Sequence, residues 1–531
     1  MERKTSTTPR SLPVHTFLVA AAPVLAIVIH NLGQLALPEI LPSLGISLLL
    51  AAVLLAAGRL VTGDGLKGGL LASLALILFF SHGHVQAALR SAHLGPPALW
   101  ANRHLLPFWG LLLALAGLAL VRARRRFGDL TRVLNLTAVL VVALQAGQIA
   151  VYKTRAALSY RTIPSGESAP SLADADSRRG RPDIYFIILD RYPNERTLRE
   201  TFGFDNGPFL DFLRSRGFHL AGESHSNYTD TAHSLASSLN MEYLDFLEEP
   251  ARLLPSDWMP LFRRIEDNRV VRLLHELDYR FIHFGSSWPA TTANRHALRN
   301  VNVIGLREFD RMLWEHSAAQ PLLRPLGLSD PFREKQARVA RNFQELARLP
   351  EDPAPTFAFA HFLLPHPPYV FGEAGPYAQS PGRDAGEAPL FLAQLRYTNS
   401  RLRELVDALL ARSSPTPIVI LQGDEGPYPE GRSGPTSFLE MSAAELRDKT
   451  SILNALLLPG ARPEGLHPGL SPVNTFRLVL RETFAADLEL LPDKIYAFPD
   501  FRHLYEFEDV TARAGESGAS ENDATDWQGG R

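Results

Sequence analysis

Cysteine is absent from the 531 residues of the chain, and net charge is nearly absent. Without cysteine there are no disulfide bonds, no thiolate zinc sites and no cysteine nucleophiles. The absence also suits a domain exposed to an oxidising exterior. The 54 Lys and Arg residues against 56 Asp and Glu residues give a formal charge of −2. A chain so close to neutral has no overall attraction for nucleic acid, so we expect no nucleic-acid partner.

The N-terminal third is very apolar and contains five segments near the length that spans a bilayer as a helix. These segments lie at roughly 14–34, 40–60, 68–88, 104–122 and 133–152. The first is not a cleaved signal peptide, because four more follow it and no small-residue cleavage site appears. Buried helices of a soluble bundle are the alternative, but five of them would leave almost no polar surface. The sequence therefore predicts a transmembrane domain of about five helices.

The positive residues of the short loops predict the orientation of this domain. The N-terminal tail and the loops after the second and fourth segments carry ten Lys and Arg residues, whereas the other two loops carry two. Positive loops face the cytoplasm, so the N-terminus is expected there. An odd number of spans then places the rest of the chain outside. We expect a multi-pass protein of the cytoplasmic (inner) membrane with an extracytoplasmic C-terminal region.

The remaining sequence alternates between strand-like and helix-like segments. Candidate strands are 183–189, 280–284, 356–364, 417–422 and 451–460, with helices such as 206–217 and 397–413 between them. Short, continuously apolar strands separated by helices predict a mainly parallel sheet covered on both faces. The predicted divisions are a transmembrane domain at 1–152, a juxtamembrane linker at 153–181, an α/β domain at 182–511 and a disordered tail at 512–531.

Four polar clusters stand at strand ends or at a helix start, where ligands collect in such sheets. They are Asp190, Thr231, His361 with His366, and Asp424 with Glu425. Each has an ordinary structural alternative: a helix cap or loop acid, an N-cap, structural histidines, and a polar turn. Carboxylates from separate strand ends also suit a divalent cation. Four coincidences are less expected than one shared site.

At these residues the chain resembles the alkaline phosphatase–sulfatase superfamily. The likeness is closest to its membrane branch of lipoteichoic acid synthases, phosphoglycerol transferases and phosphoethanolamine transferases, and it covers about residues 180–500. It implies an alkaline-phosphatase-like α/β fold with Asp190 of "ILDRYP" as a metal ligand. Thr231 of "TAHS" would be both the nucleophile and a metal ligand. "GDEG" is similar to the family's Gly-Asp-His-Gly metal segment, which implies metal ligation by Asp424 and Glu425.

The resemblance also implies substrate contacts. "HFLLPHPPY" is similar to the family's histidine segment, so His366 or His361 would contact the phosphate or protonate the leaving group. The stretch at 281–295 more loosely resembles a substrate-contacting segment. The residues implied there are His283, Trp288, Asn294 and Arg295.

Two positions depart from the family pattern. Glu425 stands where the family usually has His, and Arg191 stands where a small residue is common. A ligand set made only of oxygen favours Mn2+ or Mg2+, with Zn2+ as the alternative. Sulfatase activity itself is disfavoured, because Thr231 cannot become formylglycine. "SDPFR" at 329–333 fits the spelling of the sulfatase signature but lies far from the nucleophile position.

The function implied is a membrane-anchored, metal-dependent transfer of a phospho-head group, phosphoglycerol or phosphoethanolamine. The donor would be a membrane phospholipid, the intermediate a phospho-threonine, and the acceptor an envelope glycan or glycolipid. Two alternatives stay open. One is a metal-dependent phosphodiesterase or phosphatase that uses water as the acceptor, and the other is a non-catalytic, sulfatase-like envelope binding protein.

Overall fold

A computed structural model describes ten ranges of the chain. They are residues 11–92, 101–161, 181–248, 253–303, 307–323, 330–351, 354–381, 386–428, 437–460 and 465–515. Most of the predicted linker, at 162–180, and most of the predicted tail, at 516–531, lie outside these ranges. The chain divides into two compact units, one of residues 1–158 with 304–330 and one of residues 159–303 with 331–531.

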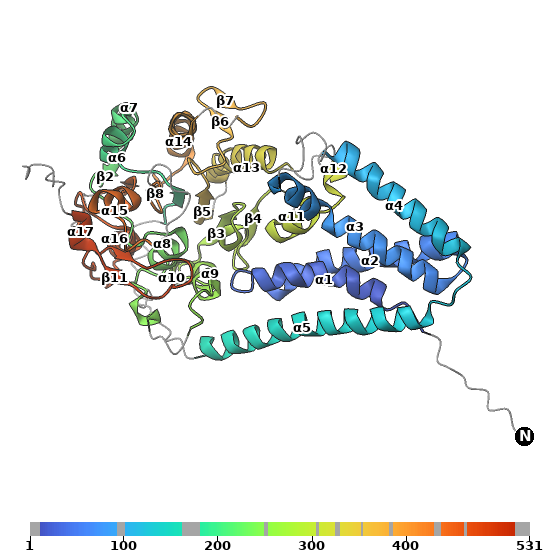
Figure 1. The fold of residues 1–531 in the computed structure, drawn as a ribbon. Coiled ribbons are helices and arrows are strands. Elements are labelled where there is room, and N and C mark those ends of the chain that lie inside the picture. The colour runs from blue at the N-terminus through green and yellow to red at the C-terminus, as the bar shows by residue number, and fades with distance from the viewer. Residues whose placement is uncertain are drawn as a thin grey trace, which may run out of the picture. The chain divides into compact units, whose positions relative to one another are not determined.

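The first unit is built from apolar helices (Figure 1). They are α1 His15–His30, α2 Leu41–Thr62 preceded by the short helix η1 Leu37–Ile40, α3 Gly65–Ser91, α4 Asn102–Arg122 and α5 Gly128–Tyr160. Among the described residues, four helical stretches are long and apolar enough to cross a membrane. At 1.5 Å per residue, the 16 residues of α1 extend about 24 Å, which is less than the ~30 Å hydrocarbon core. The fold prediction of about five apolar helices is confirmed, with α1 shorter than a full span.

Close packing of α2 and α3 depends on two glycines. A Cβ added at Gly58 would lie 2.6 Å from the carbonyl oxygen of Gly68, and a Cβ at Gly68 would lie 2.6 Å from the nitrogen of Arg59. Side chains at either position would force the two helices apart. Small residues allow helix backbones to approach in membranes, where packing replaces the hydrophobic driving force.

A segment from the C-terminal half of the sequence completes this unit. It contains α11 Glu308–Glu315 and α12 Gln320–Leu323. The hydroxyl of Ser43 in α2 donates to Asp310 at 2.5 Å and accepts from the indole N–H of Trp314 at 3.1 Å. Sequence analysis placed these residues in the α/β domain, because α11 is short and its amphipathic pattern does not say which surface its apolar face covers.

The second unit is an α/β domain around a seven-stranded sheet. Its strands are β1 Ile184–Leu189, β2 His219–Leu220, β3 Arg280–Phe284, β4 Arg299–Val301, β5 Thr356–Phe362, β8 Ile418–Gly423 and β9 Asn454–Leu457. The order is β2-β9-β8-β1-β5-β3-β4, in which β8, β1, β5, β3 and β4 run parallel. At one edge β9 pairs antiparallel with β8, and β2 pairs antiparallel with β9. The predicted mainly parallel sheet is confirmed.

Helices cover both faces of this sheet (Figure 1). They are α6 Glu195–Glu200, α7 Gly207–Ser215, α8 Thr231–Ser238, α9 Met259–Glu266, α10 Arg269–Glu276, α13 Pro331–Leu346, α14 Glu387–Arg412, α15 Ala443–Thr450, α16 Pro472–Phe484 and α17 Thr511–Gly515. The single-turn helices are η4 Asp245–Leu247, η5 Pro289–Thr291 and η6 Leu349–Glu351. Two small hairpins add β6 Phe371–Gly372 with β7 Gly375–Pro376, and β10 Tyr496–Ala497 with β11 Glu508–Asp509.

The position of β1 at the centre of the sheet explains why its sequence is continuously apolar. Ile184, Phe186 and Ile188 enter the core beneath α8, α9, α10 and α16. The alternate residues of the strand enter the opposite core beneath α7, α13 and α14. Successive side chains of a strand point to opposite faces, so a strand buried on both faces must be apolar throughout. Polar residues are confined to the strand ends, and that is where the chemistry gathers.

Candidate metal centre

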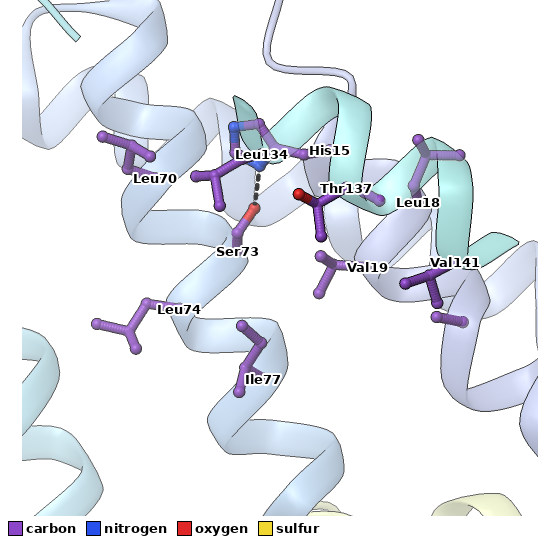
Figure 2. A pocket seen from close by; sticks show the side chains of 12 residues that line it. His15, Leu18, Val19, Leu70, Ser73, Leu74, Ile77, Leu134, Thr137 and Val141 are labelled. Carbon is purple, nitrogen blue, oxygen red and sulfur yellow. Dashed lines mark hydrogen bonds between the residues drawn. The ribbon is translucent and has the colours of Figure 1, made fainter. Parts of the chain in front are cut away.

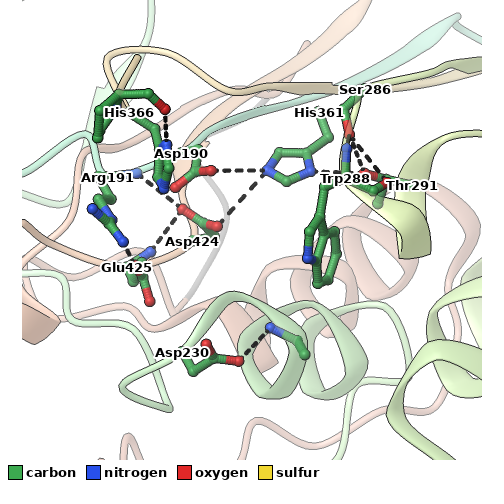
Figure 3. A network of polar contacts seen from close by, with 12 residues as sticks. Asp190, Arg191, Asp230, Ser286, Trp288, Thr291, His361, His366, Asp424 and Glu425 are labelled. Carbon is green, nitrogen blue, oxygen red and sulfur yellow. Dashed lines mark hydrogen bonds and ion pairs between the residues drawn. The ribbon is translucent and has the colours of Figure 1, made fainter. Parts of the chain in front are cut away.

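Three buried side chains meet at the carboxyl ends of neighbouring parallel strands (Figure 3). Asp190 follows β1, His361 lies near the end of β5, and Asp424 follows β8. One ligand atom from each lies within 4.8 Å of the others. The Nε2 atom of His361 is 3.9 Å from Oδ2 of Asp190 and 3.8 Å from Oδ2 of Asp424. This is the geometry of a group that converges on one ion.

Each of the three residues has one buried side-chain atom without a hydrogen-bond partner among the described residues. These atoms are Oδ1 of Asp190, Nε2 of His361 and Oδ2 of Asp424, and each of the three residues is at most 4% exposed. The described part of the chain also places no Lys or Arg in an ion pair with either aspartate. Buried unpartnered charge is strongly unfavourable, so the group fits a divalent cation that would supply the missing positive charge.

Burial sets the protonation of this group in the metal-free protein. It raises the pKa of Asp190 well above its ordinary value, with the neighbouring Asp424 adding to the effect. Burial, followed by the charge of Glu425, raises the pKa of Asp424 to about 7. Burial and the nearby His283 lower the pKa of His361 to about 3. His361 is therefore a neutral imidazole at pH 7, the form that ligates metals.

Thr291 orients His361 from the side away from the centre. Its hydroxyl lies 2.9 Å from Nδ1 of His361, and Ser286 hydrogen bonds to the same hydroxyl at 2.7 Å. The main-chain oxygen of Thr291 accepts from Nε2 of His283 at 2.9 Å. When Nδ1 of His361 donates to Thr291, the lone pair of Nε2 points at the two aspartates. Such outer partners fix the tautomer and direction of a ligating histidine.

Glu425 is held differently from the expected metal ligand. Its Oε1 atom accepts from Nε of Arg191 at 3.0 Å and forms an ion pair with Nζ of Lys449 at 2.7 Å. Both cations also lie over the ring of Tyr428, at 4.4 Å and 3.9 Å from its centroid. Glu425 is outside the converging group, although its Oε2 atom is buried without a hydrogen-bond partner among the described residues. The converging set thus contains an imidazole nitrogen and is not the all-oxygen set expected from the sequence.

Arg191 and Glu425, the two residues that depart from the family pattern, therefore contact each other. Arg191 follows Asp190 directly and has a φ of 61°, the left-handed region that residues other than glycine seldom adopt. This conformation lets its main-chain N–H donate to Oδ1 of Asp424 at 3.2 Å while its side chain reaches Glu425. One residue thus contacts both carboxylates of the "GDEG" turn.

Thr231 lies beside the centre at the start of α8. Asp230 caps this helix by accepting from the N–H of Ala232 at 2.9 Å, which leaves Thr231 as the first helical residue. The Thr231 hydroxyl lies near enough to Asp424 to oppose, as a donor, the rise in the pKa of that carboxyl. Helix N-termini carry free N–H groups and positive potential, so a hydroxyl there is well placed to react with a phosphoryl group.

His366 lies on the loop after β5 and is held close to the centre by its main chain. Its N–H donates to the carbonyl oxygen of Asp190 at 3.2 Å, and its Nδ1 contacts the carbonyl of Pro367. The buried Lys335 in α13 donates to the carbonyls of His366 and Pro368 at 2.6 and 2.9 Å, and burial lowers the pKa of Lys335 to about 7. Burial and the nearby Arg191 lower the pKa of His366 well below its ordinary value.

Only part of the segment at 281–295, which loosely resembles a substrate-contacting segment, lies near the metal centre. The indole of Trp288 meets the ring of His361 edge-on, with centroids 5.8 Å apart. The His283 ring lies behind His361 and is bonded to the Thr291 carbonyl. The side-chain amide of Asn294 donates to the carbonyl of Glu266 at the end of α9, and its oxygen accepts from the N–H of His296. Arg295 is exposed and pairs with acids at 266 and 267. The structure does not bring these last two to the cluster.

Sequence reasoning missed the residues that orient and balance the centre. Thr291 ends the single-turn helix η5, Lys335 lies in α13 and Lys449 lies in α15, and none belongs to a recognisable motif. In the sequence the two lysines look like ordinary surface charges, although in the structure each is at most 6% exposed. What could have drawn attention to Lys449 is its place directly before the buried stretch "TSILNALL".

Searches against family models and curated proteins return no match. Solved structures that the chain is similar to include the C-terminal periplasmic domain of EcEptC from Escherichia coli in complex with Zn. It has 13% identity and a TM-score of 0.41, with 62% of this chain and 93% of that one covered. The lipoteichoic acid synthase LtaP from Listeria monocytogenes has 15% identity and a TM-score of 0.37, with 66% and 84% covered. A protein in the alkaline phosphatase superfamily from Vibrio parahaemolyticus has 12% identity and a TM-score of 0.35, with 62% and 73% covered.

Proposed function

We propose that the protein is a membrane-anchored, metal-dependent phosphotransferase of the sulfatase-like type, with Thr231 as its nucleophile. One observation carries the proposal. Asp190, His361 and Asp424 present unpartnered buried atoms to a common point, beside a threonine hydroxyl at a helix N-terminus. A purely structural cluster would bury such groups only with partners.

Asp190, His361 and Asp424, together with the Thr231 hydroxyl, would hold the ion. A divalent ion bound there would lower the pKa of the Thr231 hydroxyl and offset negative charge on a phosphoryl group. The imidazole in the set favours Zn2+ or Mn2+ over Mg2+, because Mg2+ prefers oxygen ligands. Glu425 would act through charge, since Arg191 and Lys449 already neutralise it.

The residues of the chain then have separate roles. Thr231 attacks the phosphorus of a phospholipid head group, so the Thr231 O–P bond forms as the bond to the diacylglycerol oxygen breaks. The N–H groups at the start of α8 and the outer N–H groups of Arg191 receive phosphoryl oxygens. His366, which its lowered pKa keeps neutral, is the candidate to accept the Thr231 proton and pass it to the departing diacylglycerol oxygen. In the second step it would accept the proton of the acceptor hydroxyl and pass it to the Thr231 oxygen. With His361 assigned as a ligand, it leaves the proton-transfer role that the sequence suggested.

Four long apolar helices support a lipid donor, because they would keep the α/β unit at a bilayer surface. The distribution of Lys and Arg in the loops favours an extracytoplasmic position for that unit. The donor would be a phospholipid with a phosphoglycerol or phosphoethanolamine head group. The acceptor would be a hydroxyl of an envelope glycan or glycolipid.

The test uses the full chain in lipid nanodiscs with head-group-labelled phosphatidylglycerol or phosphatidylethanolamine, and Mn2+, Mg2+ or Zn2+. We expect one lipid to be consumed and the label to move to a supplied glycolipid, with loss of both in Thr231→Ala and retention in Thr231→Ser. Label released only as a water-soluble product would identify a hydrolase. Consumption of neither lipid with any of the three ions would contradict the proposal and favour a binding protein.

A further inference from the structure

The first unit, made of apolar helices, contains a cavity of about 310 Å3 between α1, α3 and α5. One end is polar and is formed by His15, Ser73 and Thr137, whereas aliphatic side chains such as Leu74 and Ile77 line the remainder (Figure 2). None of the lining residues is Lys, Arg, Asp or Glu. The cavity lies in the helical unit and shares no residue with the candidate metal centre.

The way that α5 is attached explains why a gap exists. Among the described residues, only 6% of the most apolar 18-residue stretch of α5 is buried, so packing contributes little to the position of this helix. Three polar side chains hold it instead. Asn135 donates to a carbonyl at 2.7 Å, Gln145 at 3.2 Å and Lys153 at 2.7 Å, all on the main chain of residues 12–35. The cavity lies beside the stretch of α5 between Asn135 and Gln145, where no such bond draws the helices together.

The protonation of His15 is fixed by a directed chain of hydrogen bonds. The hydroxyl of Thr16 donates to the carbonyl of Gly69 at 3.2 Å, and the hydroxyl of Ser73 donates to Thr16 at 3.2 Å. Ser73 must therefore accept from Nδ1 of His15, which lies 2.7 Å away. Nε2 of His15 is then an acceptor, and it has no partner among the described residues although His15 is only 1% exposed. An unsatisfied acceptor among membrane helices points to a ligand with a donor.

We propose that this cavity binds a neutral glycerolipid with a free hydroxyl, of the diacylglycerol type. One acyl chain lies between α1, α3 and α5, and the lipid hydroxyl donates to Nε2 of His15. Lipid is the medium around α5, and an apolar space beside it favours a hydrocarbon chain over water. A phosphate oxygen would oppose the lone pair of His15 and would meet no positive side chain.

Photolabelling of the full chain in nanodiscs tests this site. The probe is a diacylglycerol with a diazirine on one acyl chain, and the comparison probe is its methyl ether, which lacks the hydroxyl donor. We expect the wild type to label peptides of α3 and α5 about threefold to tenfold more with the free hydroxyl, the range of one net hydrogen bond. Ala138→Phe fills the cavity and should reduce labelling at least tenfold. Val139→Phe is the matched control, because Val139 is 46% exposed on the same helix, and should change labelling less than twofold.

His15→Leu gives the second readout, since it should label equally with both probes while retaining the acyl chain. Equal labelling of the wild type by both probes would overturn the assignment of His15. Labelling that Ala138→Phe leaves unchanged would show ordinary boundary lipid and would overturn the cavity as a site. If His15→Leu fails to fold, the two probes on the wild type and on Ala138→Phe still decide the question. None of these results depends on whether the α/β unit is an enzyme.

Discussion

Asp424→Asn should stabilise the metal-free protein at pH 8 while it abolishes metal binding. Burial, and then the charge of Glu425, raise the pKa of Asp424 from 3.8 to about 7. At 1.36 kcal/mol for each pH unit, this difference corresponds to at most about 4 kcal/mol of native-state free energy once the carboxyl is ionised. Asn keeps the Oδ1 acceptor that receives the main-chain N–H groups of Arg191 and Glu425 at 3.2 and 2.9 Å. The substitution therefore removes the charge and leaves the turn.

The pH dependence has a definite sign. Because the native pKa of Asp424 lies above the unfolded value, the metal-free native state binds the proton more tightly. This contribution to stability is complete below about pH 4 and is lost as the pH rises towards 7. The advantage of Asp424→Asn over the wild type should accordingly be largest at pH 8 and shrink as the pH is lowered to 5.

The assay is thermal unfolding of the full chain in detergent, with EDTA and with each divalent ion. In EDTA at pH 8 the variant should unfold several degrees above the wild type. Added ion should raise the midpoint of the wild type only. Asp211→Asn is the control, because that carboxylate is 74% exposed, and should change neither midpoint. A variant that is less stable than the wild type in EDTA at pH 8 would refute the reasoning, because the carboxylate would then be stabilised by the protein itself.

The remaining predictions concern the supports of the centre. Lys449→Met should destabilise the protein by about 3 kcal/mol in denaturant unfolding, because it leaves the buried charge of Glu425 underpaired. Adding Glu425→Gln removes that charge and should recover part of the loss. A double variant no more stable than Lys449→Met would argue against charge balance. Gly426→Ala should lower the free energy of unfolding by more than about 2 kcal/mol, because a Cβ would lie 2.0 Å from a main-chain oxygen of α15. Gly222→Ala, with open space around the added Cβ, should be tolerated. Equal unfolding midpoints for the two variants would contradict the close approach at Gly426. Thr291→Val should weaken metal binding about 10-fold to 100-fold in calorimetric titration with little change in fold, and unchanged affinity would remove its orienting role.

The sheet was predictable because its strands are buried on both faces. Continuous apolar runs such as 184–189 and 418–421, separated by helices, are typical of a mainly parallel sheet covered on both faces. The antiparallel strand at 454–457 was predicted as a strand, but its direction was not, because direction depends on the connection and not on the hydrophobic pattern. The short α11 was missed as part of the helical unit for the same reason, since its partner surface is far away in the sequence.

The candidate site was predictable only where strand ends carry carboxylates. Asp190 and Asp424 follow apolar strands, so their convergence was expected from parallel pairing. The position of Glu425 could not be read in the same way. Its side chain turns towards Arg191 and Lys449, and the second of these arrives from α15, which has no motif. Long-range charge pairing is a property of the folded chain, so the motif alone did not reveal that Glu425 contacts Arg191 and Lys449.

Direct detection of the phospho-threonine tests the central claim. The full chain would be mixed with head-group-labelled phospholipid and a divalent ion in the absence of any acceptor, quenched in acid and digested for mass spectrometry. We expect a head-group phosphodiester on Thr231, its absence in Thr231→Ala, and its disappearance when an acceptor glycolipid is added before the quench. Turnover of the lipid without any adduct on Thr231, or with full activity in Thr231→Ala, would contradict the central claim.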